Sequence, residues 1–198
     1  MKHIYQKGED GHPVFILLHG TGGDESSLIE VANILDPDAS YLGIKGEVTE
    51  NGMNRYFKRL SEGNYDEEDL NKRGQELMTF INESSQKYEF HFNDLVLVGF
   101  SNGSNIGINL LLQDDSPIKK AILMAPLYPV DTSHLTQTKD DVEVFLSMGT
   151  DDPLCPVEGS KDVIALFKNK GAQVEEFWTY THEVTLDILN TAKEWLTR

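Results

Sequence analysis

Short apolar runs alternate along the chain with segments whose apolar residues recur at helical spacing. The run from Val14 to Leu18 is continuous and of strand length, as expected for a strand buried on both faces. Further expected strands cover residues 41–44, 95–98, 121–124, 142–148 and 174–178, with a short edge strand at 2–6. Expected helices cover residues 27–35, a long segment from about 66, then 106–112, 163–167 and a closing segment through Leu186, Leu189 and Trp195. This alternation predicts an α/β fold with a doubly wound, mainly parallel sheet in one compact domain, residues 1–198, without a lid domain.

The pentapeptide Gly99-Phe100-Ser101-Asn102-Gly103 joins an expected strand to an expected helix. A G-x-S-x-G sequence in this position is typical of the nucleophile elbow of α/β-hydrolases. The sharp turn forces the serine backbone into a sparsely populated conformation, and glycines two residues away on each side remove the clashes that a Cβ would cause. We therefore predict Ser101 as the nucleophile. The alternative is a tight glycine turn without chemistry, so the prediction depends on further residues.

A second glycine-rich loop, His19-Gly20-Thr21-Gly22-Gly23, follows the strand at 14–18. In the hydrolase fold the oxyanion hole combines the backbone N–H after the nucleophile with one from a loop of this kind. The predicted donors are the N–H groups of Thr21 and Asn102. A phosphate-binding loop is the alternative, but Glu25 stands where that motif needs its third glycine.

An acid and a base are expected after the serine, in the chain order Ser, Asp, His. Asp152 follows the expected strand at 142–148, and Pro153 keeps it out of the helical region. Asp151 and, more distantly, Asp131 are rival candidates for the acid. The only histidine after Asp152 is His182, which we predict as the base. The segment after it lacks the second histidine of a zinc-protease helix.

The segment from Glu47 to Tyr65 is the exception to the regular alternation, because it is polar and rich in turn residues. Excursions at the carboxyl ends of strands form pocket walls in such folds. The candidate substrate-binding residues from this segment and from later loops are Met53, Arg55, Tyr56, Leu127 and Leu154. The alternatives are that the aromatic residues only anchor a surface loop and that Arg55 pairs with a carboxylate.

With these residues in view, the chain resembles the phospholipase/carboxylesterase family of small α/β-hydrolases, and within it the compact bacterial carboxylesterases associated with hydroquinone resistance. The resemblance covers nearly the whole chain and is carried by residues 18–25, 50–52, 55–57, 99–103, Asn105, 152–154 and His182. It implies a triad of Ser101, Asp152 and His182 with main-chain oxyanion donors at Thr21 and Asn102. Two departures are Met148, where relatives often have histidine, and Thr181, where they often have glycine.

Charge and cysteine content limit the partners. The chain has 33 acidic and 17 basic residues, a formal net charge of -16, which disfavours nucleic acid, anionic membranes and highly anionic substrates as partners.

The single cysteine, Cys155, excludes an intrachain disulfide and is expected as a small buried hydrophobe. No Cys/His cluster has zinc spacing, so we expect no metal and no cofactor. The amino terminus lacks the apolar core of a signal peptide, which favours a cytoplasmic location. The sequence does not determine the oligomeric state, and a homodimer is one of the possibilities.

The sequence therefore predicts a serine hydrolase that cleaves small neutral carboxylic esters through an acyl-enzyme, and the family resemblance implies aromatic esters as well. An acyl thioesterase would use the same residues and is the nearest alternative. Dienelactone hydrolysis is disfavoured because relatives of that type carry cysteine at the elbow. A hydrolase-fold protein that binds a ligand without turning it over is an alternative of a different class.

Overall fold

The computed structural model describes all residues from Met1 to Arg198 and is built on a seven-stranded sheet. The strand order is β1-β3-β2-β8-β9-β10-β11, with the edge strand β1 antiparallel and all other pairs parallel. The strands are β1 (His3–Gln6), β2 (Val14–Leu18), β3 (Ser40–Ile44), β8 (Leu95–Phe100), β9 (Lys120–Met124), β10 (Glu143–Gly149) and β11 (Gln173–Thr179). The α/β-hydrolase architecture with a mainly parallel sheet is thereby confirmed.

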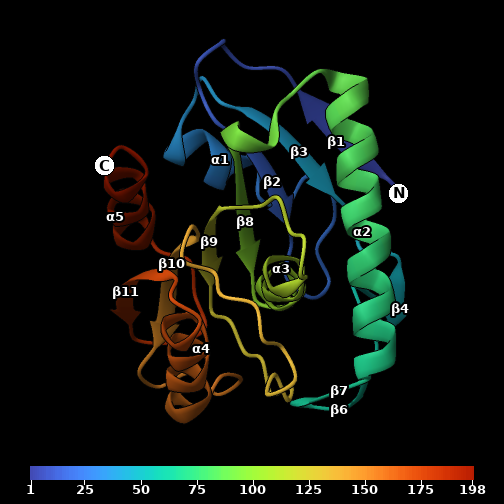
Figure 1. The fold of residues 1–198 in the computed structure, drawn as a ribbon, viewed down its shortest axis with the longest axis vertical. Coiled ribbons are helices and arrows are strands. Elements are labelled where there is room, and N and C mark those ends of the chain that lie inside the picture. Colours follow the sequence, from blue (N-terminus) through green and yellow to red (C-terminus); the bar gives the residue numbers. More distant parts are fainter.

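Helices cover both faces of this sheet (Figure 1). The helices are α1 (Ile29–Leu35), α2 (Glu67–Tyr88), α3 (Asn102–Leu112), α4 (Val157–Asn169) and α5 (Leu186–Leu196), and a 3-10 turn, η1 (Phe92–Asp94), precedes β8. Apolar residues of α2, α3 and α4 belong to one core cluster, and those of α1 and α5 belong to a second. None of these helices is both long enough and apolar enough to cross a membrane.

The central strands feed both clusters, because successive side chains of a strand point to opposite faces. In β2, Val14, Ile16 and Leu18 belong to the first cluster, whereas Phe15 and Leu17 belong to the second. All five are buried, which explains why the sequence shows a continuous apolar run there and not an alternating one.

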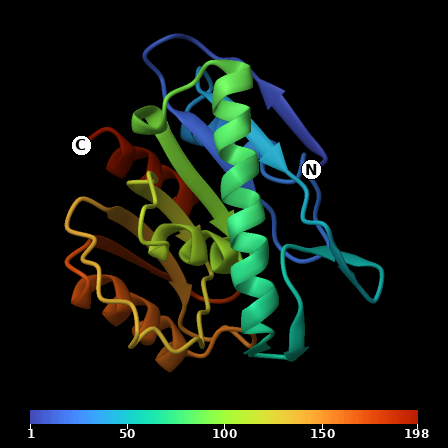
Figure 2. The same ribbon diagram turned by 45° about the vertical axis from the view of Figure 1, so that its right-hand side comes forward.

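Helix α2 is the longest helix and runs the length of the molecule in Figures 1 and 2. It begins after Asp66, whose side chain accepts a hydrogen bond from the backbone N–H of Asp69, as an N-cap does. Its buried positions Leu70, Leu77 and Ile81 face the first core cluster. The expected start near residue 66 and the expected apolar face are thus confirmed.

The segment between β3 and α2 is where the sequence was least informative. It was expected as a turn-rich excursion, and the structure folds it into two small hairpins, β4 (Val48–Glu50) with β5 (Met53–Arg55) and β6 (Arg59–Ser61) with β7 (Asn64–Tyr65). The first turn is made by Asn51 and Gly52, both with positive φ, as a tight hairpin turn requires. In Figure 1 the β6–β7 hairpin lies at the lower end, toward which the arrowheads of β2 and β8 point. This is the edge of the sheet at which the candidate site lies.

Candidate active site

Ser101 sits between β8 and α3 in a strained backbone conformation, with φ 50° and ψ -115°. The backbone N–H of Ser101 donates to the carbonyl of Met124 at 2.8 Å, which fixes the turn to the neighbouring strand β9. A Cβ at Gly99 would lie 2.7 Å from the backbone nitrogen of Ser104, and one at Gly103 would collide with the carbonyl oxygen of Leu18. Both glycines are therefore required by close backbone approach, as the elbow interpretation predicts.

The glycine loop after β2 is held by the buried side chain of His19, which is 1% exposed. Its Nδ1–H donates to the carbonyl of Gly20 at 2.6 Å, and its Nε2 accepts from the backbone N–H of Gly46 at 3.0 Å. This pattern requires a neutral ring, and burial lowers the pKa of His19 from its usual value. The backbone N–H of His19 itself donates to the Tyr56 hydroxyl at 3.0 Å. Sequence reasoning did not single out this anchoring role of His19.

The two predicted oxyanion donors lie on the same small cavity as Ser101. Neither backbone N–H is used by another protein group: that of Thr21 makes no hydrogen bond, and that of Asn102 is at the first position of α3, where no intrahelical acceptor exists. The amino end of α3 also directs the positive end of its dipole to this point. Two free donors and a helix amino end form a place suited to negative charge.

Asp152 and His182 are joined by a short hydrogen bond, with 2.7 Å between His182 Nδ1 and Asp152 Oδ2. The Asp152 side chain is fully buried and that of His182 is 14% exposed. The second carboxylate oxygen, Oδ1, accepts from the backbone N–H groups of Leu154 at 2.8 Å and Cys155 at 3.0 Å. Because the carboxylate accepts from Nδ1, the ring carries a proton there, and Nε2 is the nitrogen that makes no hydrogen bond within the protein.

His182 and Ser101 line the same cavity, and the ring of Phe100, next to Ser101, lies 5.2 Å from the His182 ring centroid to centroid. No direct hydrogen bond joins the Ser101 hydroxyl to His182. Such bonds are often long in unliganded hydrolases and tighten when substrate binds.

The rival acids occupy different surroundings. Asp151 is exposed, and its Oδ2 accepts from the Tyr180 hydroxyl at 2.9 Å. Asp131 is also exposed, and it accepts from the backbone N–H of Ser133 within its own loop. Among the three aspartates, Asp152 alone contacts His182.

The loop that carries His182 is held without a glycine at position 181. Glu183 Oε1 accepts from the Thr179 hydroxyl at 2.8 Å and from the backbone N–H of Thr181 at 3.2 Å, so it bridges the end of β11 to the loop. These hydrogen bonds lower the pKa of Glu183, with that from Thr179 as the main cause. Met148, the other departure from the family pattern, is buried in the core at 1% exposure.

The cavity around Ser101 has a volume of about 80 Å³. It is lined by Thr21, Arg55, Arg59, Glu62, Gly63, Tyr65, Ser101, Asn102, Asn105, Leu127, Leu154, Cys155 and His182. Of the five predicted substrate-binding residues, the structure brings Arg55, Leu127 and Leu154 to this wall. Met53 is 40% exposed and lies outside it, near Gly22.

Tyr56 also lies outside the cavity and has a supporting position. It is buried, its hydroxyl donates to the carbonyl of Ile44 at 2.6 Å, and its backbone N–H donates to the side-chain oxygen of Asn102 at 2.8 Å. Through Asn102 and His19 it connects the elbow to the glycine loop.

Sequence reasoning missed two wall residues that form a network. The Tyr65 hydroxyl donates to the carbonyl of Leu127 at 2.8 Å and accepts from the Asn105 amide at 2.8 Å. Asn105 Oδ1 in turn accepts from the backbone N–H of Leu127 at 2.8 Å. Asn105 was part of the family resemblance, but nothing in its local sequence indicated that it holds the Leu127 loop.

Arg55 forms the ion pair that was considered as the alternative to substrate binding. Its side chain is 5% exposed, and Nε lies 3.3 Å from Glu50 Oε2. Its Nη1 donates to the Thr21 hydroxyl at 2.9 Å, so the guanidinium also braces the glycine loop. Burial lowers the pKa of Arg55, and Glu50 opposes that shift.

Two groups of side chains have an arrangement that could hold a metal ion. The first, Asp152, Cys155 and His182, is already joined by the acid–base hydrogen bond, and burial raises the pKa of the Cys155 thiol to about 12. A protonated thiol is a poor metal ligand. The second, at the surface, consists of His12, Asp36 and Asp38, and its His12–Asp36 hydrogen bond raises the pKa of His12.

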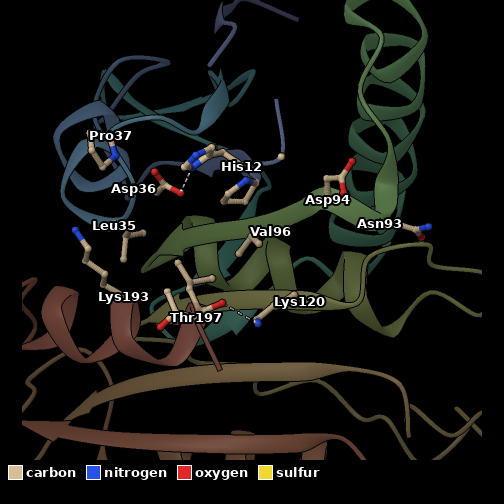
Figure 3. Close-up of a pocket in the computed structure, with 13 residues that line it drawn as sticks. His12, Leu35, Asp36, Pro37, Asn93, Asp94, Val96, Lys120, Lys193 and Thr197 are labelled. Carbon is tan, nitrogen blue, oxygen red and sulfur yellow. Dashed lines mark hydrogen bonds and ion pairs between the residues drawn. The ribbon is translucent and has the colours of Figure 1, made fainter. Parts of the chain in front are cut away.

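A larger hollow of about 460 Å³ lies at the opposite edge of the sheet (Figure 3). Its wall includes Pro13, Val96 and Lys120, which stand at the amino ends of β2, β8 and β9. Since Ser101 follows the carboxyl end of β8, this hollow is far from the elbow. In open α/β sheets ligands bind outside the carboxyl ends of the strands, so size alone does not make it the active site.

Comparison with known proteins agrees with this geometry. The phospholipase/carboxylesterase family model matches residues 1–198. The chain belongs to the phospholipase/carboxylesterase family. The chain is also similar to MhqD of Bacillus subtilis (strain 168), named as a hydrolase, with 41% identity over 196 residues, 98% of this chain and 97% of that protein. The family membership and the named relatives make this an esterase-type enzyme.

Solved structures give the same result. A crystal structure of the Bacillus cereus carboxylesterase is 42% identical and superposes with a TM-score of 0.95, covering 100% of this chain and 93% of that one. YahD, described with malic acid, is 29% identical with a TM-score of 0.93, covering 99% of this chain and 98% of that one. The family fold therefore extends over essentially the whole chain.

We predict that Gly103→Ala destabilises the protein by about 1–3 kcal/mol or more, because the new methyl group meets the rigid backbone of β2. This range is the usual cost of overpacking a core. Chemical denaturation measures this change. Gly159→Ala is the matched control, because there the Cβ meets only a terminal methyl group of Leu127, which can move. Equal stability of the two variants would contradict the close approach.

We predict that neutral His19 makes stability depend on pH. Its folded-state pKa lies below the unfolded value of about 6.5, so this contribution is complete above that pH and is lost as the pH falls below it. His12 contributes with the opposite sign, since its pKa is raised. Comparison of wild type with His19→Gln in urea denaturation between pH 5 and 8 isolates the His19 part, which should vanish in the variant. His91→Gln, at an exposed site, is the control, and an unchanged profile in His19→Gln would refute the assignment.

Proposed function

We propose that the protein is a serine carboxylesterase that cleaves small esters through an acyl-enzyme, with Ser101 as nucleophile, His182 as base and Asp152 as the residue that orients the base. The observation that carries this proposal is the 2.7 Å hydrogen bond from His182 Nδ1 to the buried Asp152 carboxylate, on the cavity that also contains the strained Ser101. Family membership supports the reaction class.

In the first half of the reaction, His182 Nε2 takes the proton of the Ser101 hydroxyl as its oxygen attacks the ester carbonyl. The resulting imidazolium is stabilised by Asp152. It then gives this proton to the departing alcohol, which leaves the acyl group on Ser101. In the second half, the same nitrogen activates a water molecule that releases the acid and restores the serine.

The negative charge of each tetrahedral intermediate would be stabilised by the free N–H groups of Thr21 and Asn102. The supporting hydrogen bonds of His19 and Arg55 hold the Thr21 loop before substrate arrives. Donors that are fixed in advance need no reorganisation when the charge forms, which is why such groups are worth about 10²–10³ in rate.

The cavity limits the substrate in size and in charge. Its volume of about 80 Å³ favours a short group beside Ser101. The expectation of a neutral ester rested on the net charge of -16, but Arg55 and Arg59 both line this cavity. Fields from distant surface charges are largely screened beyond about 8–10 Å at physiological salt, so the local guanidinium groups have the larger effect on a bound ester.

We predict that a fluorophosphonate probe labels the folded wild type covalently and that Ser101→Ala abolishes labelling. Intact-protein mass spectrometry measures the adduct, and peptide mapping locates it. Ser133→Ala removes an exposed hydroxyl outside the cavity lining and should label like the wild type. Undiminished labelling of folded Ser101→Ala, or none of the wild type, would refute the proposed serine mechanism.

We predict that Asp152→Asn lowers kcat by about 10³–10⁴-fold, because an amide at this position favours the wrong histidine tautomer. Asp151→Asn should stay within a factor of about three, since its carboxylate contacts only the exposed Tyr180 hydroxyl. Steady-state hydrolysis of a short aryl ester measures both. If Asp151→Asn lost activity and Asp152→Asn kept it, the assignment of the acid would be wrong.

A further inference from the structure

Two of the 17 basic residues of this acidic chain lie on the cavity that contains Ser101. Arg55 ends β5 and Arg59 begins β6, so both come from the two hairpins that sequence analysis left as an irregular excursion. In the proposed acyl transfer Arg55 only braces the Thr21 loop and Arg59 has no part, because the base is a histidine and the oxyanion donors are backbone groups. The presence of Arg59 beside Ser101 therefore calls for a different explanation.

The acceptors available to Arg59 leave part of its guanidinium free. Its Nε lies 3.0 Å from each carboxylate oxygen of Glu50, whereas its Nη1 and Nη2 groups make no hydrogen bond within the protein. The Arg59 side chain is 25% exposed and lines the cavity. Glu50 thus fixes the Nε end of the Arg59 guanidinium and leaves both terminal amino groups for another acceptor.

Arg55 has a similar arrangement on the other side of Glu50. Its Nε faces Glu50 Oε2 at 3.3 Å and its Nη1 donates to Thr21, while its Nη2 makes no hydrogen bond within the protein. One carboxylate therefore pairs with two guanidinium groups, and the three side chains together keep one net positive charge. Glu62 also lines the cavity, but it is exposed and forms no ion pair, so water screens its charge.

A free, anchored arginine guanidinium is a strong binding group for a carboxylate, because its planar N–H pairs and the two carboxylate oxygens align in parallel. A neutral ester would leave these donors without a strong acceptor. The small cavity volume, about 80 Å³, favours a carboxylate that lies only a few bonds from the ester carbonyl.

We propose that the substrates of this site are small esters that themselves carry a carboxylate, and that Arg59, assisted by Arg55, binds this carboxylate while Ser101 attacks the ester. This inference rests on the proposed serine esterase function and adds the class of substrate. The carboxylate can belong to the acid half, as in a monoester of a short dicarboxylic acid, or to the alcohol half, as in an acylated hydroxy acid.

The test compares matched esters on the wild-type enzyme. Monomethyl succinate carries the carboxylate in the acid half, and methyl levulinate replaces it by a neutral acetyl group of similar shape. O-acetylglycolate and its neutral methyl ester form the pair for the alcohol half, with acetate release as the measurement. We expect kcat/KM to favour the anionic member of one pair by about 10- to 100-fold, the range for hydrogen bonds to a charged group. The preference should shrink as salt is raised, because part of it is Coulombic.

Variants of Arg59 identify the group responsible. Arg59→Gln should remove most of the preference, and Arg59→Lys should restore part of it, since lysine keeps the charge but not the planar fork. Lys58→Gln is the matched control, because it changes the charge equally at the adjacent position, which is outside the cavity and pairs with Asp69. It should leave the preference as in the wild type.

The outcomes separate this inference from the function on which it rests. If the wild type hydrolyses both members of each pair equally and fluorophosphonate still labels Ser101, the esterase proposal stands and the carboxylate inference is overturned. If Arg59→Gln lowers kcat/KM for anionic and neutral esters by the same factor, Arg59 only supports the structure and the inference is again overturned. Absence of both labelling and hydrolysis would overturn the serine esterase proposal itself.

Discussion

The close approach of the amino end of α3 to the carboxyl end of β2 is the constraint on which the site depends. Gly103 lies against the carbonyl of Leu18, with no space for a Cβ. Leu18 is the last residue of β2, and the glycine loop begins at the next residue, His19. This single contact therefore brings the elbow serine and the loop of Thr21 to one point. The cost is a strained backbone at Ser101, where φ is 50°, and the packing of two central strands maintains that strain.

Asp152 and His182, the proposed acid and base, depend on a second, independent contact. Strands β10 and β11 are parallel neighbours, and Gly149 at the end of β10 is paired with Thr179 at the end of β11. Their following loops thus start side by side, which brings Asp152 within reach of His182. Backbone N–H groups hold one carboxylate oxygen and Glu183 holds the histidine loop, so the pair is fixed without help from the serine. Strand β9 lies between these two parts of the site, and the backbone N–H of Ser101 donates to its last residue, Met124.

Much of this could be predicted from the sequence, for a physical reason. Buried parallel strands produce continuous apolar runs, and the runs at 14–18, 95–98 and 121–124 lie within β2, β8 and β9. Where two backbone segments approach closely only glycine fits, so the glycines in the sequence indicated both the elbow and the loop after β2. The supporting groups were not visible, because His19, Tyr56 and Asn105 act through side-chain hydrogen bonds to backbone atoms distant in sequence. A pattern of residue types contains no information on such partners.

The hairpins between β3 and α2 show that residue composition does not predict the local electrostatics of the site either. A sum over 33 acidic and 17 basic residues describes the field far from the protein, but a bound ester lies within a few ångströms of a small number of charges. Those charges are set by which residues two short hairpins happen to bring together. Glu50 lies between Arg55 and Arg59, so a single carboxylate offsets the burial of one guanidinium and orients the other. An acidic surface and a locally basic cavity are therefore compatible in one chain, and the second follows only from the register of the hairpins.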